Sequence, residues 1–195
     1  MHFRKLESEE FSYPDYLKRK LELLNSLNLT IRDENSISDQ ELKQIISITN
    51  RETNSLEPHE KNFFIDHAKN WVLKLYNNQN ELKGFIFAHD GIVEDIELYE
   101  RGTLWIDRDL RAKWYWLWKL LMLKMTEKLE WKSILSVTAN AIVQTTNMLI
   151  MDHEIINPRW VAEKIVLHGG PIDDTYRIFT NTRLMNAIKN QEKTK

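Results

Sequence analysis

The junction between a strand and a long helix constrains the fold more than any other part of the chain. Residues 103–107 read as extended chain, and they pass directly into a helical apolar pattern over residues 110–129. Three tryptophans, Trp114, Trp116 and Trp118, stand where this helix opens. A strand-to-helix junction is the usual place for a glycine-rich turn that binds phosphate through backbone N–H groups. The segment therefore has the strand-to-helix order of a nucleotide-cofactor fold, but it carries tryptophans at the positions where such a fold has glycines.

The composition predicts one globular domain over residues 1–195 and removes several classes of partner. With 195 residues and 42% hydrophobic content, the chain can bury a substantial core. A formal net charge of -2 gives no large cationic field, so neither nucleic acid nor an anionic membrane is a default partner. The absence of cysteine excludes disulfides, thiolate zinc sites and a cysteine nucleophile. Neither a signal peptide nor a run of about 20 apolar residues occurs, so we expect a soluble, cytoplasmic protein.

The hydrophobic periodicity gives an order of strands and helices. We expect strands at 2–6, 71–76, 82–89, 92–99, 103–107, 133–138, 162–168 and 175–180, and helices at 12–27, 39–49, 57–70, 110–129, 143–151 and 183–190. The chain then divides into a strand and helical part at 1–70, an antiparallel meander at 71–107 and a last part at 108–195.

Local signals mark the ends of several elements. Ser38 lies three residues before Glu41, which is the spacing of a capping box at the start of the second helix. The pair Asp90-Gly91 predicts a tight turn, and residues 169–174 predict the turn of a terminal hairpin. Residues 191–195 are expected to fray.

This order of elements resembles the GNAT superfamily of acyl-CoA N-acyltransferases over nearly the whole chain. The similarity is densest at residues 104–121, which look like that family's strand, the approach to its basic glycine-rich turn and its cofactor helix. The family's turn follows the pattern Q/R-x-x-G-x-G/A. Arg111 matches the first position, whereas Trp114 and Trp116 occupy the two small-residue positions. The resemblance implies an α+β (α/β) fold with a mixed, mostly antiparallel central sheet flanked by helices.

The two tryptophans bear directly on the cofactor. Glycine lets the backbone approach a pyrophosphate closely, and an indole at each position adds bulk where the pyrophosphate would sit. Arg111 and Lys113 still carry positive charge near the start of the helix. They could bind a CoA 3′-phosphate or another anion, or they could form ordinary surface salt bridges. We therefore expect no cofactor in the protein, and acetyl-CoA if the protein is active.

The groups that the family uses for catalysis are incomplete in this sequence. The helix at 143–151 resembles the family's helix beside the acyl thioester, but it lacks the usual tyrosine acid near Ile150. Carboxylates on or near the strands that carry the family's general base are Glu94, Asp95, Glu97, Glu100 and Asp107. Of these, Glu97 and Asp107 are the candidates for catalysis, and the alternative for each is a solvated strand face.

The tryptophan-rich helix has two interpretations. Its apolar residues cover so wide an arc that burial on two sides is expected, against the sheet and under other helices. Alternatively, Tyr115 and Trp116 in its accessible first turn form an aromatic patch where a protein partner docks. Lys119 on this helix and Lys20 on the first helix are expected on solvated faces. The six histidines lack metal-site spacing, so no metal site is expected.

Three hypotheses for function remain. The first is a GNAT-fold protein with an impaired acyl-CoA site that acts through protein–protein interaction. The abundance of Asn and Ile, typical of an AT-rich coding sequence, suggests a virion or host-interaction protein of a tailed phage, cytoplasmic or virion-associated. The second is an active acetyl-CoA-dependent N-acetyltransferase, which would place acetyl-CoA beside splayed strands near Ile106 and Ser136. The third is a small-anion sensor that uses Arg111 and Lys113.

Overall fold

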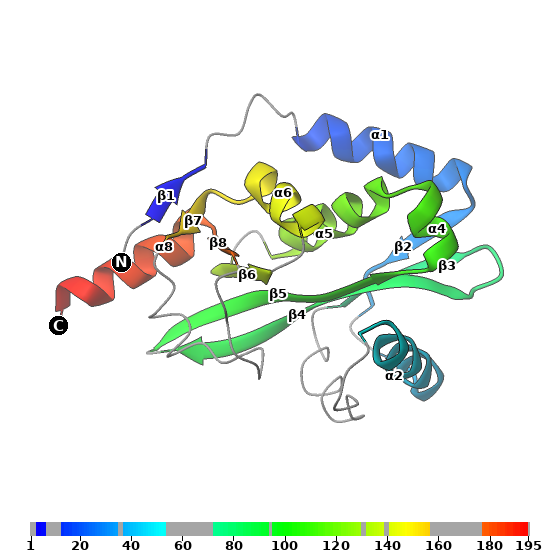
Figure 1. Cartoon of the computed structure of the whole chain (residues 1–195), viewed down its shortest axis with the longest axis horizontal. Helices are drawn as coiled ribbons and strands as arrows, with labels where there is room; N and C mark the ends of the chain where they lie inside the picture. Colours follow the sequence, from blue (N-terminus) through cyan, green and yellow to red (C-terminus); the bar gives the residue numbers. More distant parts are fainter. Residues whose placement is uncertain are drawn as a thin grey trace.

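The computed structural model describes residues 3–6, 13–34, 37–53, 72–93, 95–129, 132–138, 141–156 and 177–194. In this part of the chain an eight-stranded sheet runs through the molecule, and helices lie on both of its faces (Figure 1). None of the described helices combines the length and the apolar character that a membrane span requires.

The sheet is antiparallel except at one pair of strands. In spatial order the strands are β1 (Phe3–Lys5), β7 (His153–Ile155), β8 (Arg177–Thr180), β6 (Ile134–Thr138), β5 (Ile96–Ile106), β4 (Leu82–Val93), β3 (Val72–Asn77) and β2 (Leu29–Arg32). Only β5 and β6 run parallel to each other among these neighbours. The expected mixed, mostly antiparallel sheet flanked by helices is therefore confirmed.

Helices cover the two faces of the sheet in separate groups. The first group is α1 (Tyr13–Ser26), α5 (Trp116–Lys128) and α6 (Ala141–Ile150), and the second is α2 (Asp39–Thr53) and α8 (Thr182–Thr194). Alternation along β4 explains the two layers, because successive strand residues point to opposite faces. Ile86 and Ala88 belong to the apolar cluster under α1 and α5, whereas Phe85 and Phe87 pack with Leu42 of α2.

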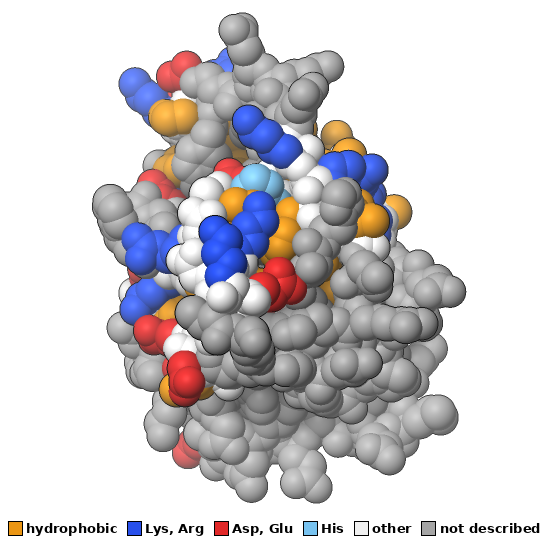
Figure 2. Space-filling view, turned by 90° about the vertical axis from the view of Figure 1, so that its left-hand side faces the viewer, with side chains coloured by type: hydrophobic (Ala, Val, Ile, Leu, Met, Phe, Trp, Pro, Cys, Tyr) orange, Lys and Arg blue, Asp and Glu red, His pale blue; other side chains and the backbone are white. Residues whose placement is uncertain are grey.

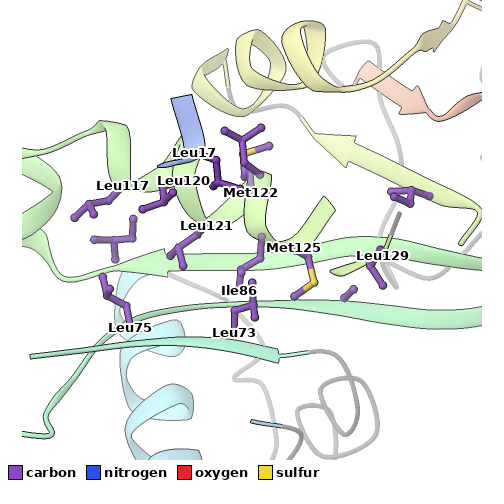
Figure 3. Close-up of a cluster of buried hydrophobic side chains, with 14 of the residues drawn as sticks. Leu17, Leu73, Leu75, Ile86, Leu117, Leu120, Leu121, Met122, Met125 and Leu129 are labelled. Carbon is purple, nitrogen blue, oxygen red and sulfur yellow. The ribbon is translucent and has the colours of Figure 1, made fainter. Parts of the chain in front are cut away.

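Helix α5 forms the centre of the first layer. Its buried residues are Leu117, Leu120, Leu121, Met122, Leu123 and Met125. They contact the sheet through residues such as Leu73 and Ile86, and they contact α1 through Leu17 (Figure 3). Full burial of one large apolar side chain stabilises a fold by about 1.5–3 kcal/mol. The expectation that this helix is buried on more than one side is confirmed.

Helix α1 connects the two opposite edges of the sheet. β1 pairs with β7 at one edge, and β2 pairs with β3 at the other. The chain between these strands therefore crosses the face that carries α5, and α1 packs on that helix through Leu17 and Leu24 (Figure 1). The sequence did not predict β2 or β7, because both are too short to show a clear alternation of apolar residues.

The edge strand β1 is joined to the sheet by charged side chains. Arg4 on β1 donates to the carboxylate of Glu154 on β7, and Arg177 on β8 donates to both oxygens of that carboxylate at 2.7 and 2.8 Å. Burial raises the pKa of Glu154, but the hydrogen bonds from Arg177 and Arg4 outweigh it and lower the pKa. Figure 2 shows Lys and Arg side chains gathered at this end of the molecule. Charged side chains at a sheet edge oppose pairing with another sheet.

The expected capping box at the start of α2 is confirmed, and it belongs to a larger cluster. The Ser38 N–H donates to the Glu41 carboxylate at 2.8 Å, and the Glu41 N–H donates to Ser38 Oγ at 3.3 Å. Lys74 of β3, only 1% exposed, binds both Glu41 and Glu34 at 2.9 Å. The Tyr76 hydroxyl also donates to Glu41. Glu41 thus caps α2 and attaches it to the sheet.

Two expected strand boundaries are wrong. Asp90-Gly91 lies inside β4 rather than at a turn, because β4 stays paired with β5 as far as Val93 opposite Ile96. The chain reverses just beyond that pair, where Asp95 adopts a positive φ of 67°. A short polar residue tolerates this left-handed conformation better than most. β5 is then one continuous strand where the sequence predicts two.

The expected single helix over 110–129 is also wrong. The chain forms α4 (Arg108–Lys113) and then α5, with a break at Trp114 and Tyr115. At the C-terminus, α8 continues to Thr194, so the expected fraying from residue 191 is wrong for the described residues. The predicted helix at 57–70, the strand at 162–168 and the turn at 169–174 lie outside the described residues.

We predict that Glu41→Gln destabilises the protein by about 2 kcal/mol at neutral pH, because buried Lys74 loses its less exposed carboxylate partner. Equilibrium urea unfolding measures this change. Burial raises the pKa of Glu41, but hydrogen bonds from Lys74 and Ser38 lower it below the ordinary 4.5. The carboxylate therefore contributes fully above about pH 4.5 and progressively less as the pH falls further.

The matched control is Glu127→Gln, which removes the exposed partner of Lys124 and should change stability by less than about 0.5 kcal/mol. Equal effects of the two substitutions would contradict the role of Glu41. A difference between wild type and the Glu41 variant that persists unchanged in strong acid would also contradict it.

Candidate functional site

The parallel strands β5 and β6 separate after two paired positions. Tyr99 pairs with Ile134 and Glu100 with Leu135, and no further pair joins these strands in the described residues. Directly after this point β5 carries a β-bulge at residues 102–103, where one residue of β4 faces two of β5. A bulge bends its strand and increases the local twist. The bulge accounts for the divergence of β5 from β6.

A buried polar network occupies the divergence. Arg101, the first residue of β5 after the paired positions, is 4% exposed. Its guanidinium donates to Thr126 Oγ1 of α5 at 2.7 Å and to Asn147 Oδ1 of α6. The Asn147 amide then donates to Ser136 Oγ of β6 at 2.9 Å. The network thus joins both diverging strands to the two helices above them.

The amide of Asn147 determines how this network is arranged. Asn147 is completely buried, and its oxygen accepts from Arg101 while its nitrogen donates to Ser136. Hydrogen bonds that involve a charged group contribute about 1.5–3 kcal/mol each, and an unsatisfied buried group costs as much. The network is therefore a structural part of the divergence.

Local backbone hydrogen bonds span the break between α4 and α5. The Trp114 N–H donates to the Leu110 carbonyl at 2.8 Å and ends α4. The Leu117 N–H donates to the Trp114 carbonyl at 2.9 Å, and the Trp118 N–H to the Tyr115 carbonyl at 3.2 Å. These bonds occupy two amides of the first turn of α5. Amides at this end of a helix are the groups that otherwise bind phosphate.

The tryptophans at the break belong to the core. Trp114, Trp116 and Trp118 are all partly buried and pack against the apolar cluster that includes α5. Tyr115 differs, because 72% of it is exposed. The indoles thus pack with the core, and Tyr115 is accessible to solvent. Whether Tyr115 and Trp116 bind a protein partner stays a prediction.

A pocket of about 550 Å³ lies between α1, α5 and α6. The residues that line it are Tyr16, Lys20, Tyr115, Trp116, Lys119, Ile142, Thr145, Thr146 and Leu149. Lys20 Nζ lies 4.8 Å from the centre of the Trp116 ring, and Lys119 Nζ lies 4.5 Å from that of Tyr16. Burial lowers the pKa of Lys119, and the positive charge of Lys20 lowers it further. The pocket thus combines aromatic walls with two neighbouring ammonium groups.

The two cations that the sequence singles out for anion binding lie on α4 and not in this pocket. Arg111 and Lys113 lie in the last turn of α4, where positive side chains interact favourably with the helix carbonyls. Neither lines the pocket. The sequence placed them near the start of the long helix because it did not reveal the break before α5. The cations that do line the pocket, Lys20 and Lys119, were expected on solvated faces, since no spacing in the sequence relates two residues so far apart.

The structure keeps the two candidate catalytic carboxylates apart. Glu97 and Asp107 lie at opposite ends of β5, roughly 30 Å from each other by the rise of an extended strand. Asp107 caps α4 by accepting from the Asp109 N–H at 3.0 Å. Glu97 accepts from the Tyr99 hydroxyl, and burial together with this contact raises the pKa of Tyr99 to about 12. Both carboxylates have structural partners.

The other carboxylates of this region are also separated. Glu100 is 1% exposed and points to the opposite face of the sheet from Arg101, since successive strand residues alternate. Asp95 is exposed at the β4–β5 turn, and Glu94 lies outside the described residues. No group of three His, Asp or Glu side chains in the described part of the chain comes together as a metal site would require.

Comparisons with known proteins bear on the fold. No protein-family model matches the chain, and no curated protein sequence matches it. Solved structures do match. Naa50 of Arabidopsis thaliana, in complex with the bisubstrate analogue CoA-Ac-MVNAL, is 12% identical with a TM-score of 0.51, over 80% of this chain and 99% of that one.

Two bacterial structures agree with this match. A GNAT-family acetyltransferase from Staphylococcus aureus Mu50 is 15% identical with a TM-score of 0.50, over 78% of this chain and 98% of that one. N-acetylglutamate synthase from Neisseria gonorrhoeae, complexed with coenzyme A and N-acetyl-glutamate, is 13% identical with a TM-score of 0.52. That match covers 78% of this chain but only 34% of the synthase. At such identities the likeness establishes the architecture alone: the chain has the fold of the GNAT superfamily.

Proposed function

We propose that the chain is a GNAT-fold binding protein whose acyl-CoA site is closed by its own side chains and which acts by contacting another protein. The observation that carries this proposal is the network of Arg101, Asn147 and Ser136 at the divergence of β5 and β6. The resemblance to GNAT enzymes implies that an acyl thioester would lie beside these splayed strands. Here a buried guanidinium and a buried amide occupy that place.

Displacing this network would be unfavourable. A ligand that entered the divergence would break the contacts of Arg101 with Thr126 and Asn147. It would also have to leave the guanidinium buried among fewer acceptors, and that typically costs several kcal/mol. A bound acyl group offers one carbonyl oxygen and apolar atoms, which do not replace these contacts.

The start of α5 supports the same proposal. In GNAT enzymes a glycine-rich turn at this position holds the pyrophosphate of CoA through backbone amides. In this chain Trp114 and Trp116 fill the turn, and the Leu117 and Trp118 amides bind carbonyls of the turn itself. A pyrophosphate at this position would contact indole rings. The Leu117 and Trp118 N–H groups, already bonded to carbonyls, would not be available to bind it.

On the described helix α6 the family's proton donor has no equivalent either. The α6 side chain that reaches the divergence is Asn147, and a carboxamide does not ionise at neutral pH. Ile150, near which the family's tyrosine was expected, packs against the apolar core. A departing thiolate would therefore find no acid on this helix.

An exposed apolar surface beside the pocket supports a protein partner. Tyr115 is 72% exposed and Ile142 is 50% exposed, and both line the pocket. Helix α6 carries no charged residue, and Thr145 and Met148 continue its exposed side. Aromatic and apolar side chains without charges are typical of the centre of protein interfaces. The virion or host-interaction setting is a further proposal that rests on composition alone.

An active acetyl-CoA-dependent N-acetyltransferase is the second candidate. The observation in its favour is the parallel pairing of β5 and β6, which ends after two positions as that activity requires. It would need Arg101 and Asn147 to move aside when the cofactor binds. Binding of acetyl-CoA therefore separates the two candidates.

We predict that calorimetric titration of the full chain with acetyl-CoA gives no saturable binding, with any Kd weaker than about 1 mM. The reason is that Arg101 and Asn147 fill the divergence where an acyl group would bind, and two backbone amides in the first turn of α5 already donate to carbonyls. Saturable binding at micromolar concentration would overturn the closed-site proposal and favour the enzyme. A parallel assay for release of CoA thiol, with a mixture of peptide amines, checks the same point independently.

A double-mutant cycle tests whether Arg101 and Asn147 act as one unit. We predict that Arg101→Met and Asn147→Leu each destabilise the chain by about 2–3 kcal/mol, because each leaves a buried partner unsatisfied. The double variant should lose about 1–2 kcal/mol less free energy of unfolding than the two single losses added together, since both polar groups are then removed. Urea unfolding measures all three, with the exposed pair Lys124 and Glu127 as the control cycle. Additive effects would show that the network does not act as one unit.

Site-specific photo-crosslinking tests the partner surface. We predict that p-benzoylphenylalanine at Tyr115 captures one defined protein in the cells that produce this chain. The matched control is the same residue at Ile92, which is 76% exposed at the far end of β4 and outside the proposed surface. The same set of captured proteins at both positions would contradict a specific interface at Tyr115.

A further inference from the structure

We propose that the edge strand β2 is a self-association surface, through which two copies of this chain pair antiparallel across a two-fold axis. β2 ends the sheet, and β3 is the strand that pairs with it in the described part of the chain. Antiparallel pairing of β2 with β2 of a second copy would join the two sheets into one. This contact is separate from the surface at Tyr115, and it does not rest on the proposed function.

The outer side of β2 carries backbone groups that do not bond to the sheet. On β3, the Asn77 N–H donates at 3.2 Å to a carbonyl on the β4 side. Backbone polar groups alternate in direction along a strand, so those of Tyr76 face β2 and its paired residue Thr30. Leu29 and Ile31, the neighbours of Thr30, therefore direct their N–H and C=O groups away from the sheet. An edge with such groups is a template for a further strand.

The side chains of β2 are self-complementary when the two-fold axis passes beside Thr30. Thr30 then lies opposite Thr30 of the second copy, and Leu29 of each copy lies opposite Ile31 of the other. Each Leu29–Ile31 pair exchanges both N–H···O=C bonds, so all outward groups of the strand are used. Threonine pairs can hydrogen-bond across neighbouring strands. Arg32, the one charged residue of β2, lies opposite Asn28, so no like charges meet.

The helical layers of the two copies agree in this register. Directly opposite residues of antiparallel strands point to the same face of a sheet. Leu29 and Ile31 belong to the apolar cluster under α1 and α5, so these helices lie on one side of the joined sheet in both copies. Arg32 points to the other face, where its guanidinium lies 4.4 Å from the centre of the Tyr76 ring and donates to Asn80. Its charge is thus held by its own copy.

The opposite edge of the sheet has features that oppose such pairing. β1 consists of Phe3, Arg4 and Lys5, and both of its charged residues are exposed. The equivalent register would place Arg4 opposite Arg4 of the second copy, and like charges at such positions are destabilising. β1 therefore carries charges of the kind that protect a sheet edge, whereas the first three residues of β2 are uncharged.

A pocket of about 470 Å³ beside β2 adds apolar surface to this edge. Its apolar lining comes from Leu21 and Leu24 of α1, Ile31 of β2 and Leu73 of β3. A second copy on β2 would cover the side formed by Ile31 and remove apolar surface from water, which favours association. The contact still involves one short strand from each copy, and interfaces below about 1,200 Å² are typical of weak complexes. We therefore expect a dimer with a Kd of about 10–100 µM.

Sedimentation velocity of the full chain tests this pairing. We expect the mass of the wild type to rise from that of a monomer toward that of a dimer between about 1 and 500 µM. Thr30→Lys and Thr30→Glu each place like charges across the axis, and each should weaken the dimer by about tenfold or more. An equimolar mixture of these two variants should restore the dimer, because opposite charges then meet. The control Thr145→Lys, on the exposed side of α6, should leave the dimer unchanged.

A cysteine crosslink gives a second measurement. The chain contains no cysteine, so a single substitution introduces a single thiol. Opposing residues of a non-hydrogen-bonded antiparallel pair have Cα atoms about 4.5 Å apart, which a disulfide can span. Oxidation of Thr30→Cys with copper phenanthroline should therefore give a covalent dimer, whereas Thr145→Cys should stay monomeric.

Three results would overturn the inference. The first is a wild type that stays monomeric at about 500 µM. The second is a mixture of Thr30→Lys and Thr30→Glu that associates no more than either variant alone. The third is a dimer that Thr145→Lys dissociates and the Thr30 variants do not, because that dimer would form through α6. Crosslinking that is equally strong at both cysteine positions would also contradict pairing through β2.

Discussion

The packing of α5 between the sheet and the helices α1 and α6 is the interaction on which the described structure depends. Its leucines and methionines contact β3 and β4 on one side and α1 on the other (Figure 3). This packing fixes the position of Thr126, which binds Arg101, and of Trp116 and Lys119, which line the pocket. Burying one helix thus positions both the closed divergence and the open pocket.

The two sites follow from different parts of the fold. The divergence comes from the end of parallel pairing and the bulge in β5, and polar side chains from four elements fill it. The pocket comes from the path of α1, which crosses from one sheet edge to the other and brings Tyr16 and Lys20 against α5. The divergence and the pocket thus arise from separate features of one fold.

The sequence predicted the features that local pattern controls. The capping box at Ser38 and Glu41, a long apolar helix within residues 110–129 and the order of the main strands along the chain follow from spacing and periodicity. The sequence does not predict the break before α5, because the tryptophans there continue the apolar pattern of the helix. The burial of Arg101 is also not predicted, because a charged residue on a strand usually faces solvent. Its burial depends on the bulge in β5 and on α6, which only the tertiary structure brings together. The sequence predicts Arg111 and Lys113 near the start of one long helix, whereas they lie in the last turn of the short helix α4.

The central claim is that Arg101 and Asn147 permanently occupy the place of an acyl group. A crystal structure grown in a large excess of acetyl-CoA tests it most directly, because it shows the divergence itself. The account predicts that Arg101 still contacts Thr126 and Asn147 and that no thioester lies between β5 and β6. Electron density for the pantetheine arm between these strands, with the Arg101 side chain displaced, would contradict it.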